Sequence, residues 1–513
     1  MTNDKGTKVR QIQRFCVVLH MMLTIFLGAC SMYPQDKSHS SLVACSSLTN
    51  TTNRETSRGS WRQSFRAACR DSKGQVAGGS EILHLVPHRG SLFAANGFWM
   101  DKSHYWYGGN DPSKPWGQVL RLDASEQGWQ VDAVFANHLR IESLASVSFS
   151  TDYKGRSLNS TQSVLLAAAY EGNGEGGINL FERDDVHKRW LSTRIVKDSL
   201  GAKGIANSVR VIKQYRDKLT GIDRVFVAAG IHGIWSGAFA NDQERRIVWT
   251  TEAEFGPLPV RALSLAEANN SLFVSVGSMI YRRVDGHTPH YERIAEIGDS
   301  KPSDVMASVG GIRGMAAVPS PDGRAESLLF LWTPGKHARA CMMRMDPEPN
   351  DSIRYQLPVI EVCLDEMIET HLRGIPVRFV LGAYNEIFSL RRAERYESIE
   401  LFGVEAIVAD RDAPTAMNQP MGEGGFYAGA IVVARKGAGN YRLTEVNCFP
   451  LQSESPLVAL RTIAASPFDA LQGGELYFGG YDANFHLGQD TAWIFRSSSE
   501  LFYRLFEEQS SPC

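Results

Sequence analysis

Short apolar segments recur in a fixed order along most of this chain. In each copy, one apolar segment is followed by a second that ends near glycine and by a third that carries a basic residue. The copies follow one another about every 50–60 residues. The clearest copy comprises Pro259–Leu263, Leu272–Gly277 and Met279–Arg283. Short apolar and aromatic runs bounded by Gly, Asp or Asn are typical of β-strands.

The copies number seven between residues 79 and 507, and the weakest lies between residues 372 and 448. No single copy carries enough strands to bury both of its faces, whereas a closed ring of such sheets would bury them. The sequence therefore predicts an all-β chain with a β-propeller at residues 79–507, most simply of seven blades, followed by a tail at 508–513. Six or eight blades remain open, and a pair of β-sandwiches is the rival fold.

The N-terminal residues have the character of an export signal. Basic residues precede an apolar run from Cys16 to Leu27, which is too short to cross a bilayer comfortably. The run ends in Leu27-Gly28-Ala29-Cys30, which resembles the lipobox of bacterial lipoproteins. An ordinary secretory signal and an uncleaved anchor are the alternatives.

The lipobox resemblance implies a signal peptide at 1–29, lipidation (palmitate) of Cys30 and a bacterial cell-envelope location. Ser31 after the cysteine favours the outer membrane, with the leaflet left open. Residues 30–78 are rich in Ser and Thr and are expected to form a tether. Its second half, which contains Trp61, Phe65 and Cys69, could dock on the propeller.

Six cysteines remain after the signal and Cys30 are set aside, and an exported protein can form disulfides. Cys341 and Cys363 are expected on neighbouring strands of one blade, so they are the first predicted pair. Cys45 with Cys69 and Cys448 with Cys513 are the next candidates. Buried free thiols are the alternative for these last four.

One position recurs in the first strand of every copy. It is occupied by His84, Glu142, Arg210, Arg261, Arg313, Arg378 and Arg461. First strands of propeller blades line the central channel, so these side chains are expected to surround the axis. Two like charges about 10 Å apart repel by about 1.7 kcal/mol at an effective dielectric of about 20. Either each arginine pairs with a carboxylate or carbonyl of a neighbouring blade, or the arginines together bind an anion.

Two loops are weaker candidates. Trp99, Tyr105 and Trp106 could stack on a glycan or fold down as a plug. Asp482 and Asn484 are weak candidates for a calcium ligand set, and otherwise no metal site is indicated. Gly172–Gly177 has the letters of a dinucleotide loop but precedes a strand, so a hairpin turn is predicted. No catalytic motif or cofactor signature is present in the sequence.

These observations leave three functional hypotheses. The net charge of −2 and the lack of a basic tract argue against nucleic-acid binding. The leading hypothesis is a lipid-anchored propeller that binds an anionic ligand, a glycan or an envelope protein. The second is an enzyme of the lyase, lactonase or quinoprotein type that acts on an acidic sugar or small molecule. The third is a structural scaffold of an envelope complex.

Overall fold

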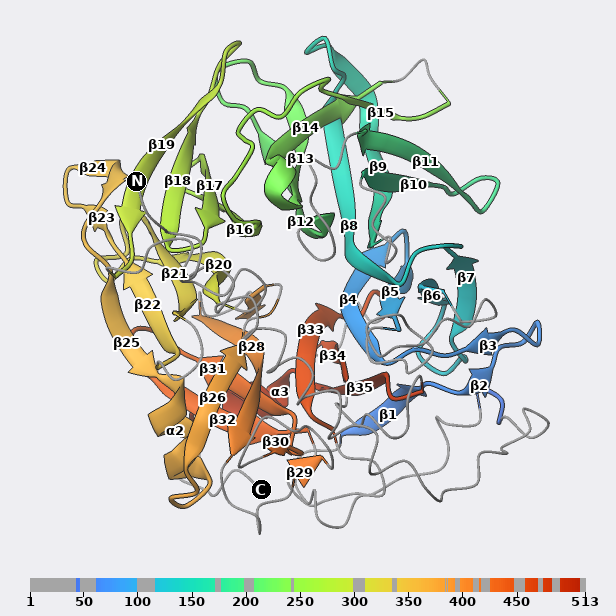
Figure 1. Ribbon diagram of the computed structural model, residues 1–513, viewed down its shortest axis with the longest axis vertical. Coiled ribbons are helices and arrows are strands. Elements are labelled where there is room, and N and C mark those ends of the chain that lie inside the picture. Colours follow the sequence, from blue (N-terminus) through green and yellow to red (C-terminus); the bar gives the residue numbers. More distant parts are fainter. Residues whose placement is uncertain are drawn as a thin grey trace, which may run out of the picture. The chain divides into compact units, whose positions relative to one another are not determined.

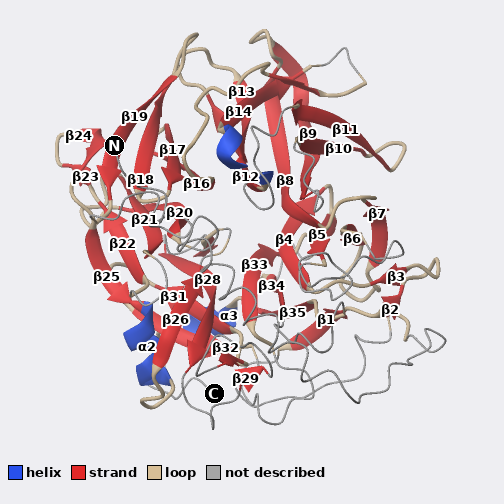
Figure 2. Cartoon of the chain, in the orientation of Figure 1, coloured by secondary structure: helices blue, strands red, loops and turns tan. Residues whose placement is uncertain are grey.

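The computed structural model describes residues 43–46, 61–98, 116–170, 177–197, 207–240, 244–298, 310–334, 339–382, 384, 386–392, 397–408, 415–416, 425–446, 457–468, 474–481 and 490–507. All of them belong to one compact unit, Val43–Cys513. Strands dominate this unit, and helical segments are short (Figure 2).

Antiparallel pairing groups most described strands into four-stranded blades. The first three are β4 (Glu81–His88), β5 (Ser91–Gly97), β6 (Gln118–Leu122) and β7 (Gln130–Val134); β8 (Arg140–Thr151), β9 (Ser157–Tyr170), β10 (Ile178–Asp184) and β11 (Arg189–Val196); β12 (Val209–Arg216), β13 (Asp223–Ala229), β14 (Ile234–Phe239) and β15 (Ile247–Trp249). The next two are β16 (Ala262–Ala268), β17 (Ser271–Val276), β18 (Met279–Val284) and β19 (His290–Glu296); β20 (Gly311–Pro319), β21 (Glu326–Thr333), β22 (Cys341–Met345) and β25 (Val359–Cys363).

The sixth blade contains β26 (Val377–Gly382) and β27 (Phe388–Arg392), which both pair with β28 (Glu397–Val408), and then β31 (Ile431–Arg435) and β32 (Tyr441–Glu445). The seventh contains β33 (Ala459–Ala465), β34 (Glu475–Tyr481), β35 (Trp493–Ser498) and β1 (Arg62–Arg66). The remaining elements are β2 (Cys69–Arg70), β3 (Val76–Ala77), β23 (Pro347–Glu348), β24 (Asp351–Tyr355), β29 (Thr415–Ala416), β30 (Gly425–Tyr427), α2 (Leu364–His371) and α3 (Glu500–Arg504).

The sheets surround a common centre, and the first strands of neighbouring blades lie side by side (Figure 1). The last blade also adjoins the first, because β33 lies beside β4. This arrangement is a β-propeller, so the predicted all-β propeller is confirmed and the sandwich alternative is excluded. The blade count of seven stays a prediction, because pairing alone joins the described strands into one 12-stranded sheet, one seven-stranded sheet, three four-stranded sheets and two two-stranded sheets. The blades are numbered according to that prediction.

The N-terminal part of the described chain closes the ring. Strand β1 pairs antiparallel with β35, from Arg62 opposite Arg496 to Arg66 opposite Trp493. A strand from the segment expected to be a tether thus completes the last blade. The ring therefore includes residues that precede 79. Strand β1 lies shortly before the first blade in the sequence but pairs with a strand of the last blade. This pairing therefore holds the first and last blades together.

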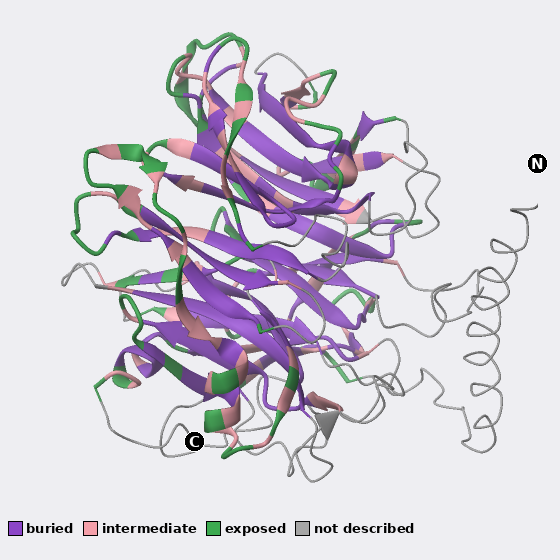
Figure 3. Ribbon diagram, turned by 60° about the vertical axis from the view of Figure 1, so that its left-hand side comes forward, coloured by how far each residue is buried: buried purple, intermediate pink, exposed green. Residues whose placement is uncertain are grey.

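Apolar side chains fill the spaces between blades. Figure 3 shows buried residues along the strands and exposed residues in the turns that connect them. One cluster joins Phe273 of β17 to Ile312 and Phe330 of the next blade, and all three side chains are fully buried. Burying side chains of this size contributes about 1.5–3 kcal/mol each. Sheet-to-sheet packing of this kind stabilises the ring.

Buried ion pairs also link neighbouring blades at their third strands. Arg183 of β10 binds Asp132 of the preceding blade at 2.9 Å. Arg283 of β18 binds Glu254, which follows β15, at 2.8 Å. Arg435 of β31 binds Glu361 of β25 at 2.7 Å. The basic residue that recurs in the third segment of the repeat therefore joins one blade to the preceding one at these three junctions.

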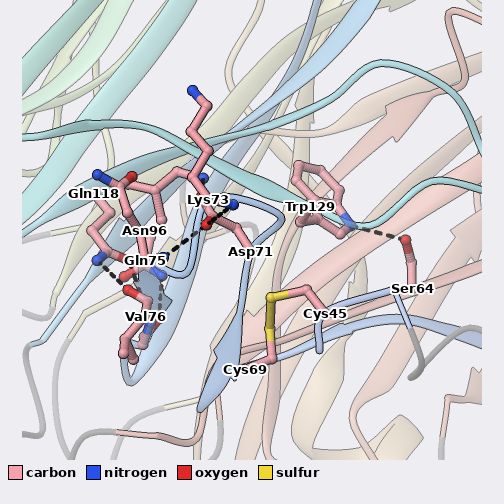
Figure 4. Close-up of a disulfide and its surroundings, with 12 residues drawn as sticks. Cys45, Ser64, Cys69, Asp71, Lys73, Gln75, Val76, Asn96, Gln118 and Trp129 are labelled. Carbon is pink, nitrogen blue, oxygen red and sulfur yellow. Dashed lines mark hydrogen bonds between the residues drawn. A yellow bond between two sulfur atoms is a disulfide. The ribbon is translucent and has the colours of Figure 1, made fainter. Parts of the chain in front are cut away.

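Two disulfides lie among the described cysteines. Cys341 and Cys363 are directly opposite one another on β22 and β25, which confirms that predicted pair. Cys45 bonds to Cys69 and ties residues 43–46 to β2 (Figure 4). Cys448 and Cys513, the third candidate pair, lie outside the described residues.

Hydrogen bonds hold the Cys45–Cys69 segment onto the first blade (Figure 4). Asp71 accepts backbone hydrogen bonds from Lys73 and Gln75, both at 2.8 Å, and so shapes the turn between β2 and β3. The Gln118 amide donates to the carbonyl oxygen of Val76 at 2.9 Å. The Trp129 indole donates to Ser64 Oγ at 3.0 Å.

Among the described residues, no helix has the length and apolar character needed to cross a membrane.

Candidate functional site

In most blades, the first strand carries the same irregularity. Its pairing with the second strand shifts register near the strand's start, as it does between Ile82 and His84 or between Leu460 and Thr462. The same shift occurs in β8, β12, β16 and β20. Strand β26 shifts register between Val377 and Phe379, but at a different level, opposite Val408 and Ile407 of β28. A β-bulge re-aims side chains at one point of a strand. The repeated bulge explains how one recurring sequence position can face the axis in many blades.

Three arginines from different blades surround the ring of Tyr384. The guanidinium carbons of Arg461, Arg210 and Arg313 lie 3.6, 4.2 and 5.1 Å from the ring centroid. Arg313 also donates to the carbonyl oxygen of Tyr384 at 3.4 Å. Cations over an aromatic face are attracted by about 0.5–2 kcal/mol each. Tyr384 is therefore the meeting point of the arginines.

The insertion that carries Tyr384 interrupts the first strand of the sixth blade. Strand β26 pairs with β28 as far as Gly382 opposite Val404, and β27 resumes pairing at Phe388 opposite Leu401. The interruption lies opposite Phe402 and Gly403, the last two residues of β28 that pair with the third strand, β31. The bulge of the other blades lies at this same level. By position in the sheet, Tyr384 therefore corresponds to the arginines of the other blades.

Glu142 is the central carboxylate on one side of the site. It accepts hydrogen bonds from Arg140 Nε at 2.6 Å and from Arg210 Nη1 at 2.7 Å. Arg140 also binds Glu81 at 2.8 Å. Burial raises the pKa of the Glu142 carboxyl, but the positive charges of Arg140, Arg210 and Arg261 outweigh it and lower the pKa to about 2. Glu142 is thus ionised at neutral pH.

A second carboxylate, Glu405 of β28, lies beside Arg461. The ion pair between them measures 3.4 Å, and the Tyr481 hydroxyl donates to Glu405 at 2.6 Å. Arg461 and Arg210 therefore each pair with a carboxylate of the preceding blade, as the inter-blade interpretation predicts. Arg261 donates instead to Ser208 Oγ at 2.7 Å.

The remaining cationic side chains experience excess positive charge. Burial and the charge of Arg210 lower the pKa of Arg313 to about 9 and lower the pKa of Arg261 well below its ordinary value. His84 donates a hydrogen bond from Nε2 to the Glu142 carbonyl oxygen at 3.1 Å. Burial and Arg210 lower the pKa of His84 to about 4, so its imidazole is neutral at pH 7.

We call these ten residues the axial cluster: Glu81, His84, Arg140, Glu142, Arg210, Arg261, Arg313, Tyr384, Glu405 and Arg461. Five guanidinium groups face three carboxylates, so the cluster carries a formal charge of +2 when Tyr384 is neutral. Its arginines are at most 8% exposed. Nε and Nη2 of Arg210 are buried and have no hydrogen-bond partner among the described residues. Within that part of the chain, the cluster therefore has donors without partners and fewer carboxylates than guanidinium groups.

The phenol of Tyr384 responds to this imbalance. Burial raises its pKa, but the positive charges of Arg210, Arg461 and Arg140 outweigh burial and lower the pKa to about 7. Ionisation of the phenol would reduce the formal charge of the axial cluster by one. Tyr384 thus acts as a partial internal counter-ion at neutral pH.

The structure brings together six of the seven residues expected at the axis: His84, Glu142, Arg210, Arg261, Arg313 and Arg461. Arg378 differs, because it lies on β26 before the insertion and is exposed. Comparison of the repeats in the sequence assigned Arg378 to the axial position, because the five residues inserted between β26 and β27 do not change the apolar pattern. The sheet register assigns that position to Tyr384.

Sequence reasoning missed four members of the axial cluster: Glu81, Arg140, Tyr384 and Glu405. Glu81 and Arg140 are the first residues of β4 and β8. A charged residue at the start of two first strands was the sequence feature that could have identified them. Trp99, Tyr105 and Trp106 lie outside the described residues, as do Cys30, Asp482 and Asn484. Where the structure describes the chain, no group of three or more His, Cys, Asp or Glu side chains could hold a metal ion.

A cavity of about 900 Å³ adjoins the axial cluster at His84. It is lined by the first strands after their bulges, and His84 is the axial-cluster residue that reaches it. At its far end lie Asn270 and Glu326, which flank the turns between first and second strands. We call it the channel cavity. Its volume is within the range of about 300–1,000 Å³ that is usual for small-molecule sites.

The fold and this site define a β-propeller with a cationic axial cluster. No family model matches the chain, and no curated protein matches its sequence. Solved structures similar to it include a Dyadobacter fermentans protein of unknown function, with 9% identity, a TM-score of 0.35, and coverage of 82% of this chain and 95% of that one.

Two further similar structures are of proteins whose names state a function. The periplasmic gluconolactonase of Pseudomonas aeruginosa has 12% identity and a TM-score of 0.36, with 71% of this chain and 88% of that one covered. The Aleuria aurantia lectin has 11% identity and a TM-score of 0.32, with 72% and 96% covered. Likeness at this level carries no argument about function. The fold assignment rests on the strand pairing of this chain.

Proposed function

We propose that the axial cluster binds a small oxyanion or the anionic group of a larger ligand. The single observation that carries this proposal is the excess of five guanidinium groups over three carboxylates at the axis. A buried donor without a partner costs about 1–3 kcal/mol, and Arg210 has two nitrogens without a partner in the part of the chain that the structure describes. An anion would satisfy those donors and reduce the repulsion between the arginines.

Guanidinium chemistry narrows the ligand to carboxylates, phosphates and sulfates. Arginine presents paired N–H donors that match two oxygens of one such group. The lowered pKa values of Arg261 and Arg313 have the same cause, because each is buried among like charges. A bound anion would raise both values toward the ordinary range. Carboxylate sugars, simple organic acids and phosphate are therefore the ligand classes to test.

Calorimetric titration of the purified protein with phosphate, sulfate and galacturonate at constant ionic strength tests this function. Wild-type protein should bind at least one of the three. Arg210→Gln should weaken that binding at least tenfold, and Arg313→Lys, which keeps the charge but loses the paired donors, should weaken it less. Arg156→Gln removes a charge at a position 68% exposed and should leave binding unchanged.

Circular dichroism of each variant separates loss of binding from loss of folding. A folded Arg210→Gln variant that binds the anion as well as wild type would reject the axial site. Absence of any anion binding by wild-type protein would do the same. If Arg210→Gln does not fold, Arg313→Lys tests the axial site instead, because it retains the buried positive charge.

We further propose that the chain is anchored to the bacterial envelope through a lipid on Cys30. The Leu27-Gly28-Ala29-Cys30 sequence after an apolar run supports this proposal. Expression in a bacterium supplied with an alkyne-labelled palmitate should label wild-type protein and leave Cys30→Ala unlabelled. Equal labelling of both proteins would contradict it.

A further inference from the structure

The walls of the channel cavity contain both partnered and unpartnered charged or polar side chains. Glu267 pairs with Lys218 at 3.3 Å, and Glu326 accepts the Asn269 backbone N–H at 2.8 Å. Gln214 accepts the Ser148 backbone N–H at 2.7 Å. These three groups are already held by neighbouring parts of the propeller, so they belong to its walls.

Lys213 and Glu386 are different. Both line the channel cavity, and neither side chain makes a hydrogen bond or ion pair within the part of the chain that the structure describes. The Arg391 side chain of β27 also lines the cavity without such a partner among the described residues. Lys213 comes from β12 in the third blade, whereas Glu386 immediately precedes β27 in the sixth. They therefore reach the cavity from well-separated blades of the ring. Their charges interact electrostatically but do not form an ion pair.

Small and apolar side chains occupy much of the wall between these two charges. Ala145, Ala316 and Ala465 line the channel cavity and are at least partly exposed. Met315 and Phe388 come from two further points on the wall. Short side chains leave the centre of the ring open at this level. Lys213 and Glu386 thus place two unlike charges on separate blades around an apolar surface, and Arg391 adds a further cation on β27, the strand that follows Glu386.

We propose that the channel cavity binds a small zwitterion of the α-amino-acid class. The ligand carboxylate would pair with Lys213 and its ammonium group with Glu386. A ligand that carries only an anion would leave Glu386 without a counter-charge, and one that carries only a cation would leave Lys213 without one. A zwitterion satisfies both side chains in one molecule, and the apolar wall accommodates its side chain. This site is separate from the proposed anion site in the axial cluster.

Calorimetric titration of the full chain with L-leucine, N-acetyl-L-leucine and L-leucinamide tests this proposal. The first probe has both charges, the second lacks the ammonium group and the third lacks the carboxylate. Wild-type protein should bind L-leucine at least tenfold more tightly than either derivative. Equal affinity for all three, or no binding of L-leucine, glycine and L-lysine, would overturn the zwitterion site.

Variants assign the two charges. Lys213→Met and Glu386→Gln should each weaken L-leucine binding at least tenfold. The double exchange, Lys213→Glu with Glu386→Lys, should restore most of the affinity because it keeps both charges and reverses their positions. If L-leucine binding is unaffected by both single variants, the two side chains do not form the site.

The same variants distinguish this proposal from the anion site. Phosphate binding at the axial cluster should be unchanged in Lys213→Met and Glu386→Gln, since neither residue belongs to that cluster. Arg210→Gln should in turn leave L-leucine binding intact. Loss of both activities in every variant would instead indicate a single shared site and would overturn the inference of two sites.

Discussion

The guanidinium carbon of Arg461 lies 3.6 Å from the centroid of the Tyr384 ring, although the two residues belong to different blades. Arg210 and Arg313 approach the same ring from two further blades. One aromatic side chain at the axis is therefore in contact with cations from three sheets. This contact links the fold of the ring to the electrostatics of its centre.

Tyr384 should ionise near neutral pH. Its pKa is about 7 in the folded protein, well below the ordinary tyrosine value of about 10. Ultraviolet difference absorbance should show one tyrosine that titrates close to pH 7, and Tyr384→Phe should remove that transition. A wild-type titration in which every tyrosine ionises above pH 9 would contradict the arrangement of arginines around this ring.

The same shift predicts a pH dependence of stability. Between about pH 7 and pH 10 the unfolded tyrosine holds its proton while the folded one has released it, so stability from this group rises with pH. As pH falls through 7, this contribution is lost. Urea unfolding at a series of pH values should show the rise in wild type and a smaller rise in Tyr384→Phe. Identical curves for the two proteins would exclude it.

Glu142→Gln should destabilise the protein severely. The substitution leaves Arg140 and Arg210 buried without their shared carboxylate, and breaking a buried pair in this way costs about 3–5 kcal/mol. Chemical denaturation measures the change in unfolding free energy. Glu292→Gln is the matched control, because Glu292 is 49% exposed and pairs with Arg282 at the surface. That exchange should cost less than about 1 kcal/mol.

Removal of the Cys341–Cys363 bond should lower the thermal midpoint. Loss of a native disulfide costs about 2–4 kcal/mol, so the double variant Cys341→Ala with Cys363→Ala should unfold earlier than wild type. Peptide mapping without reductant should recover the two cysteines in one linked pair of peptides. Recovery of both as free thiols in the exported protein would refute the bond.

Deletion of the closing strand should disrupt the ring. Removing residues 1–70 exposes the edge of β35 and takes away Trp61, whose ring packs 4.8 Å from that of Phe478. Broad, non-cooperative thermal unfolding is expected. Removing residues 1–42 leaves β1 and the Cys45–Cys69 bond in place and should preserve the wild-type transition. A sharp, unshifted transition after the longer deletion would show that β1 is dispensable.

The propeller could be predicted because its signal is repeated. Copies such as the one around Leu272–Gly277 each show strand-like runs, and seven weak signals in the same order support one another. The position at the axis was likewise visible, since Arg210, Arg313 and Arg461 lie near the start of their first strands and Arg261 immediately precedes β16. Cys341 and Cys363 were paired correctly because neighbouring strands of one blade bring them together.

The sequence by itself determined that this chain builds repeated antiparallel sheets and that arginine recurs in their first strands. Only the tertiary structure decided that Tyr384 occupies the axis in place of Arg378, and that Glu81 and Glu405 face the arginines. The physical reason is that strand formation depends on local patterns of apolar and polar side chains, which can be recognised in the sequence. Convergence at an axis depends on bulges, insertions and ring closure, which bring together residues that are hundreds of positions apart.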